Sequence, residues 1–316
     1  MLADYIYKIG NYNTDYIMSG FASEGYADIL NIGKSILASS STGIAAIIKN
    51  RHRGAFDFTE SGAKKRRYEF IIIPTIGFLG SNDPLIPDCE LKLSFDRLAP
   101  KMSLISLKDN PPDFDGLDIK DCYALTEYIS SPSLRAHYAT LSTKPIVYEF
   151  EDIEVLVKSL PNDSMVRLDN IRGGNIPSYI FAALIPSADL NGNIDESCTG
   201  FKHFDVEEIN ITVNGNSVSG YPLTIQDGMA IFPLHKFNEA TNRLCNNAAS
   251  SAMKIGEYDY NWLYGHRFEA EGSQGWLSIN VKFKTVSTNP LSMVIWIIYP
   301  SAITIDKYHQ IEKIFL

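Results

Sequence analysis

The chain contains few cysteines, no long apolar segment and no excess of positive charge. Its longest apolar run, residues 293–299, is far shorter than the ~20 residues that span a bilayer. The net charge is −9, which argues against bulk electrostatic binding of nucleic acid. The four cysteines form no CxxC pair, so neither a zinc site nor a dense disulfide framework is indicated; they are Cys89, Cys122, Cys198 and Cys245.

The N-terminal residues show no basic segment followed by an apolar one, so we predict no signal peptide. Free thiols and synthesis inside a cell are the corresponding expectation. Hydrophobic residues make up 45% of the 316 residues, and Tyr and Phe are abundant at 17 and 16. This composition predicts one or two packed cores rather than a disordered chain.

Alternating side chains predict strands with one buried face. Residues 276–284 place Leu277, Ile279, Val281 and Phe283 on one side, and residues 90–97 do the same with Leu91, Leu93 and Phe95. In residues 209–218, Ile209, Ile211 and Val213 share a face, and Asn214-Gly215 follows as a tight hairpin turn.

Two further segments are apolar on both faces. Residues 179–185 and 293–299 are rich in β-branched and aromatic side chains and are each about seven residues long, which predicts central strands buried between two layers. Residues 68–78 predict a strand that bends at Pro74.

Helical patterns are short and few. They cover residues 2–9, residues 133–141 behind a serine cap, and residues 234–244 after Pro233. Such helices cannot cover both faces of a parallel sheet. We therefore predict an all-β antiparallel fold, a sandwich or jelly roll, with short helical insertions and a division of the chain near residue 142.

Motifs for nucleotide or metal binding are incomplete. Lys34-Ser35 ends a phosphate-loop-like segment, but Asp28 occupies the position of its first glycine. A calcium-loop-like alternation lacks the required glycine and glutamate, so a turn is the better interpretation; it comprises Asp189, Asn191, Asn193 and Asp195.

Catalytic patterns are also missing. The six histidines show no i,i+4 pair and no HExxH, and Cys198 and His203 have no nearby ligand-type partners; the histidines are His52, His137, His203, His235, His266 and His309. A GxSxG nucleophile motif is likewise missing. We assign no catalytic, cofactor-binding or metal-binding residue, predict no cofactor, and do not expect an enzyme.

One basic cluster, Lys64 to Arg67, follows further basic residues at Lys49, Arg51 and Arg53. It is interpreted as a solvated loop before the strand at 68, with nuclear import or contact with packaged DNA as the alternatives.

The second half of the chain carries an ordered series of short motifs, at Pro132-Ser133, Ala136-His137, Pro145-Ile146, Ile176-Pro177, Asn191-Gly192, Phe201, His203, Phe204, Gly215, Pro222-Leu223 and Ile305-Asp306. In order and spacing this series resembles the major capsid (hexon-like) proteins of Polinton/Maverick elements and adintoviruses. Weaker similarity continues upstream through residues 64–80 and 86–105.

The resemblance implies a double jelly roll, two antiparallel sandwiches side by side, in a homotrimeric capsomer that tiles an icosahedral shell around double-stranded DNA. It implies a virion location, with neighbouring capsomers and minor capsid or penton proteins as partners. Residues 1–142 would be the first jelly roll with a helical linker, and residues 143–316 the second, complete one.

Family members extend further at the N-terminus, so the first jelly roll is expected to lack its early strands, and residues 1–130 are expected to fold poorly alone. Two alternatives stay open. One is a minor or vertex capsid protein with a single jelly roll, which predicts no strands before residue 130. The other is a β-sandwich that binds carbohydrate or another ligand through exposed Tyr258, Tyr260 and Trp262.

Overall fold

The computed structural model describes residues 55–60, 63–68, 85, 90–94, 122–123, 131–139, 144–192, 201–225, 230–241, 262–268, 274–308 and 310–315. Its helices are α6 (Pro132–Ala139), α7 (Ile231–Ala240) and the short 3-10 helix η4 (Ser187–Asn191). Its strands are β1 (Ala55–Glu60), β2 (Ala63–Tyr68), β3 (Ile146–Ser159), β4 (Met165–Asn175), β5 (Tyr179–Pro186), β6 (Val206–Val213), β7 (Asn216–Ser217), β8 (Leu223–Thr224), β9 (Leu263–Arg267), β10 (Gln274–Phe283), β11 (Leu291–Ile305) and β12 (Ile311–Phe315).

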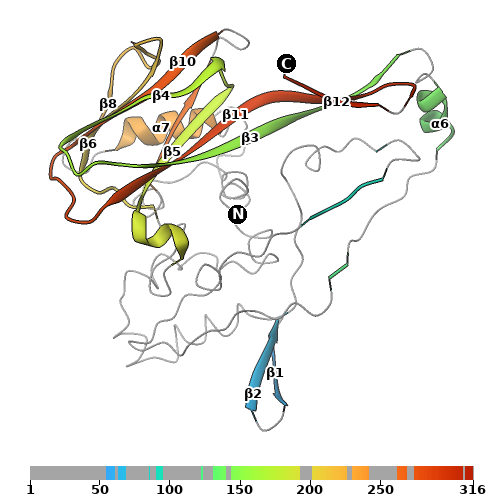
Figure 1. Ribbon diagram of the computed structural model, residues 1–316, viewed down its shortest axis with the longest axis horizontal. Coiled ribbons are helices and arrows are strands. Elements are labelled where there is room, and N and C mark those ends of the chain that lie inside the picture. The colour runs from blue at the N-terminus through green and yellow to red at the C-terminus, as the bar shows by residue number, and fades with distance from the viewer. Residues whose placement is uncertain are drawn as a thin grey trace.

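Strands β3 to β11 form two antiparallel sheets (Figure 1). One sheet has the order β3-β11-β5-β9, and the other has the order β4-β10-β6-β8, with the short β7 also paired to β6. Strands β3 to β6 alternate between the sheets, and the last strand returns beside the first. This is the strand order of an eight-stranded jelly roll.

The core lies between and around these sheets. Strand β10 buries Leu277, Ile279, Val281 and Phe283 and turns the alternate side chains outward. Residues 293–299 of β11 are buried throughout, as are residues 180–185 of β5. The opposite sheet covers one face of such a strand. Other side chains must therefore cover its second face.

Aromatic side chains provide that second cover. Phe181 and Trp296 lie opposite each other in the β5–β11 register and therefore share a face. Phe237 of α7 meets the Phe181 ring edge-on at 5.8 Å, and Phe201 meets the Trp296 ring edge-on at 5.5 Å. Gly265 of β9 permits this packing, because a Cβ atom there would lie 2.9 Å from the Phe181 ring.

Strands β3 and β11 continue beyond the sandwich as a two-stranded ribbon that β12 widens, here called the arm (Figure 1). On the side of β11 away from β3, β5 pairs with residues 291–298 and β12 with residues 301–305. Pro300 lies in the gap between these partners, where its lack of an N–H interrupts neither ladder.

The all-β prediction is confirmed, and so are the strands at 179–185, 276–283 and 293–299. The hairpin turn is also confirmed, since Asn214 and Gly215 have φ angles of 52° and 82°. Helix α6 begins after Ser131, whose Oγ accepts the Ser133 N–H at 3.3 Å as the expected cap. Helix α7 begins three residues earlier than the sequence pattern indicates, with Pro233 in its first turn.

Two predictions are wrong. Of the strand predicted at 90–97, residues 90–94 form no strand, Leu91 and Leu93 are exposed, and none of the described strands pairs with them, whereas residues 95–97 lie outside the described residues. Lys64 to Arg67 lie in β2, paired with β1, rather than in a loop. The predictions for residues 2–9 and for the strand at 68–78 beyond Tyr68 fall outside the described residues, and the division near residue 142 stays a prediction.

Candidate interaction surfaces

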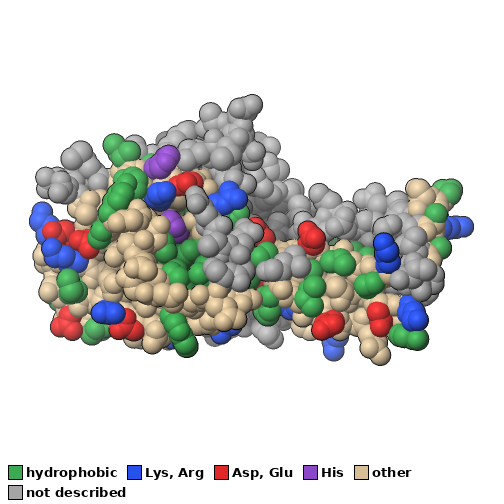
Figure 2. Space-filling view, turned by 90° about the horizontal axis from the view of Figure 1, so that it is seen from above, with side chains coloured by type: hydrophobic (Ala, Val, Ile, Leu, Met, Phe, Trp, Pro, Cys, Tyr) green, Lys and Arg blue, Asp and Glu red, His purple; other side chains and the backbone are tan. Residues whose placement is uncertain are grey.

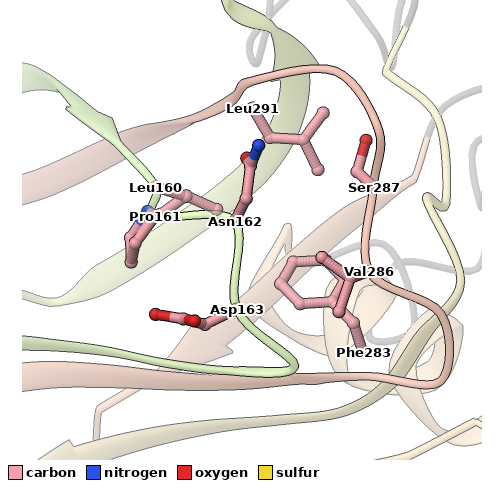
Figure 3. A pocket seen from close by; sticks show the side chains of 8 residues that line it. All are labelled: Leu160, Pro161, Asn162, Asp163, Phe283, Val286, Ser287 and Leu291. Atoms are coloured by element: carbon pink, nitrogen blue, oxygen red, sulfur yellow. The ribbon is translucent and has the colours of Figure 1, made fainter.

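The pocket drawn in Figure 3 lies between the turn after β3 and the segment that joins β10 to β11. Leu160, Phe283 and Leu291 form its apolar wall, and Asp163 and Ser287 stand at its rim. Its volume is about 10 Å³, enough for about one water molecule. This pocket is too small to hold a substrate or cofactor.

Two histidines are substantially buried. His266 of β9 is 8% exposed, and its Nδ1 has no hydrogen-bond partner among the described residues. Burial lowers its pKa to about 4, Lys236 adds to the effect, and Glu239 opposes it. His203 packs against the Trp262 ring at 4.1 Å, and burial lowers its pKa while Asp205 opposes the shift. Both imidazoles are neutral at neutral pH, His266 within the core and His203 half-buried.

The calcium-loop-like segment forms a turn where it is described. Asp189 is buried within η4, and the Gly192 N–H donates to the Asp189 carbonyl at 3.0 Å. Asn193, Asp195 and Cys198 lie outside the described residues. Within the described ranges, no three His, Cys, Asp or Glu side chains are grouped closely enough to hold a metal ion.

One other sequence feature, the aromatic group expected of a ligand-binding module, can be placed in part. Trp262 is 5% exposed, so it cannot be the surface aromatic expected of a ligand-binding module, and Tyr258 and Tyr260 fall outside the described residues. Lys34 and Ser35 also fall outside them.

Among the helices that the structure describes, none has the length and apolar character needed to cross a membrane.

The arm carries both charged and apolar side chains. Lys313 of β12 reaches across β11 to Asp152 of β3, with 2.6 Å between Nζ and Oδ2, and its Nζ lies 5.9 Å and 5.4 Å from the Phe150 and Phe315 ring centres. Ile311 and Phe315 are each more than half exposed. On the face shown in Figure 2, acidic and basic side chains are interspersed along the arm, with hydrophobic ones between them.

A second exposed apolar group stands on the other sheet. Trp276, at the start of β10, is 58% exposed and lies against Gly173 of β4, its partner in the register. The backbone N–H of Trp276 donates to Oδ1 of Asn214 at 2.9 Å, and the Asn214 N–H donates to the Trp276 carbonyl at 3.0 Å. Alternation along residues 276–284 places this indole outward.

No protein-family model matches the chain, and no curated protein is significantly similar to it in sequence. Three of the solved structures that resemble it come from viruses. The crystal structure of the mavirus major capsid protein aligns with 7% identity and a TM-score of 0.32, covering 60% of this chain and 44% of that one. PBCV-1 VP54, fitted into a reconstruction of the virophage Sputnik, aligns with 8% identity and a TM-score of 0.38, covering 58% and 54%. The Sputnik virophage structure aligns with 13% identity and a TM-score of 0.34, covering 54% and 39%. This chain thus spans about half or less of each of these structures.

Proposed function

We propose that the protein is a structural capsid subunit, with a building role rather than a catalytic one. The observation that carries the proposal is the jelly-roll strand order of residues 144–315, an architecture that recurs in the shells of viruses. A jelly roll also serves other functions, so the fold alone does not decide the matter. The ordered motif series at residues 132–306 adds a resemblance to one capsid family.

The finer proposal is a major capsid protein of the Polinton and adintovirus type. It would form homotrimeric capsomers with a pseudo-sixfold outline in an icosahedral double-stranded DNA virus or virus-like element. Its partners would be other copies, neighbouring capsomers and penton or minor capsid proteins, and its location the virion. Residues 1–142 would supply the first jelly roll, and Lys64 to Arg67 would at most touch packaged DNA.

The β1–β2 hairpin favours this proposal over a single-jelly-roll minor or vertex protein, because that alternative predicts no strands before residue 130. The arm also offers exposed apolar side chains for contacts between subunits. Ile311 and Phe315 project from a thin sheet that extends beyond the sandwich, and burying the exposed part of either side chain against a neighbour contributes about 1–2 kcal/mol.

The test is the assembly state of the purified full chain, measured by light scattering after size exclusion and by electron microscopy. We expect trimers with a hexagonal outline. The double variant Ile311→Asp/Phe315→Asp should shift the population to monomers, while Tyr221→Asp, at an equally exposed aromatic on the sandwich, should not. A wild-type chain that folds but stays monomeric at high concentration contradicts the proposal.

A further inference from the structure

We propose that the outer face of the β4-β10-β6 sheet binds a neutral oligosaccharide, with Trp276 as the platform on which one sugar ring stacks. This site does not depend on the capsid proposal, because it rests on the sheet alone. It also differs from the site that the sequence suggested, since Trp262 is buried and Trp276 is not.

Gly173 fixes the position of the indole. A Cβ atom at residue 173 would lie 2.3 Å from Cζ3 of Trp276 and 2.5 Å from Cε3, so the six-membered part of the ring occupies the space that any other residue would fill. One side of the ring rests on the backbone of β4 and a large part of the indole faces solvent. An aromatic ring held in this way binds a flat apolar surface with little loss of side-chain entropy.

Uncharged amide side chains surround the ring on the same face of the sheet. Gln274 precedes Trp276 by two residues on β10, and Asn175 is opposite Gln274 in the register. Asn214 faces Trp276 from the end of β6, and its Oδ1 is engaged by the Trp276 N–H, which leaves the Nδ2 hydrogens outside that bond. All three amides are exposed.

The polar surface continues along the sheet away from the ring. Ser278 and Asn280 follow on β10, opposite the buried Thr212 and the partly exposed Asn210 of β6. Asn280 is only partly exposed and its Oδ1 is buried, so its contribution to the outer surface is limited to the rest of the side chain. The ionic side chains of this sheet lie beyond the amides that border the ring: Arg167 of β4, opposite Asn280, pairs with Asp169, and Lys282 pairs with Glu207 at the far end.

The chemistry of this face selects its ligand. The C–H face of a pyranose is apolar and flat, and its rim carries hydroxyls that both donate and accept hydrogen bonds. A stacking ring bordered by amides and hydroxyls matches both properties, because each amide offers one acceptor and two donors. The uncharged amides beside the ring favour a neutral sugar over a sialylated or sulfated one, and the polar side chains that follow on β10 favour contact with more than one linked sugar.

The test uses the full chain on an array of neutral and acidic oligosaccharides, followed by titration calorimetry with the neutral oligosaccharide that binds best. We expect Trp276→Ala to weaken binding about tenfold or more. Gly173→Ala keeps the indole but displaces it, so its affinity should also fall several-fold. Tyr308→Ala, which removes an exposed ring on the turn before β12, should bind as the wild type does.

Fluorescence gives a second readout. The chain has three tryptophans, and Trp262 and Trp296 are buried, so quenching by acrylamide reports mainly on Trp276. The bound oligosaccharide should protect this fluorescence, and Trp276→Phe should abolish the protected component. Absence of binding by the wild type to every sugar on the array overturns the proposal. Wild-type affinity in Trp276→Ala also overturns it, as does a Trp276→Ala variant that changes only the assembly state, which would assign the ring to a contact between copies.

Discussion

His266 makes the stability of the sandwich depend on pH in a direction that the structure determines. Its imidazole is buried in β9 and neutral, with a pKa of about 4 against an ordinary value of 6.5. Burial is the main cause, Lys236 on α7 contributes, and Glu239 opposes it. Between these two pKa values the unfolded chain binds a proton at His266 and the folded chain does not.

The free energy of unfolding should therefore be highest above pH 6.5 and fall as the pH drops towards 4. The difference of about 2.5 between the two pKa values corresponds to about 3 kcal/mol. This is a large share of the 5–15 kcal/mol that a domain commonly has. His203, whose pKa is also lowered by burial, adds a contribution of the same sign.

Urea unfolding between pH 4 and pH 7, followed by tryptophan fluorescence, measures this dependence. In His266→Gln the loss of stability on acidification should be smaller than in the wild type by about 3 kcal/mol, and the His203 contribution should remain. His235→Gln, at an exposed position on α7, is the matched control and should keep the wild-type slope. Equal slopes in the wild type and His266→Gln would refute the assignment of a neutral, buried imidazole.

Three further results are expected. Gly265→Ala should lower the unfolding free energy by about 1–3 kcal/mol, because its Cβ would lie 2.9 Å from the Phe181 ring and 3.2 Å from the Phe237 Cα; an unchanged thermal midpoint would contradict this packing. Gly215→Ala should cost about 1 kcal/mol in the same assay, because residue 215 has a φ of 82°, and no loss would mean that the turn relaxes freely. Limited proteolysis should leave a resistant fragment that begins between residues 131 and 146, identified by mass spectrometry, and preferential survival of the N-terminal half would contradict the proposed division.

The sequence was most informative where one strand's own side chains determine its environment. The alternation in β10 and the uniformly apolar β5 and β11 predict burial correctly, because the core removes such side chains from water whichever partner strand is present. Asn214-Gly215 predicts its turn for a similarly local reason, since the required φ angles are intrinsic to those residues.

Features that depend on distant partners could not be predicted in this way. Residues 90–94 alternate as well as β10 does, but no strand forms there. The pairing of β12 with β11, which completes the arm, has no local signal because residues 311–315 mix charged and apolar side chains. Trp276 packs against Gly173, which lies about a hundred residues earlier in the chain. Only the β4–β10 register brings the two residues together.

The continuity of β11 also has a mechanical consequence. The same strand is hydrogen-bonded to β3 from Ser292 to Ile305, so core and arm share one uninterrupted ladder. A force that pulls the end of β11 outward while β3 is held in place loads these hydrogen bonds together in shear instead of opening them one after another. Force applied to β11 at the outer end of the arm is thus transmitted along this strand to the β3-β11-β5-β9 sheet, which contains Trp296.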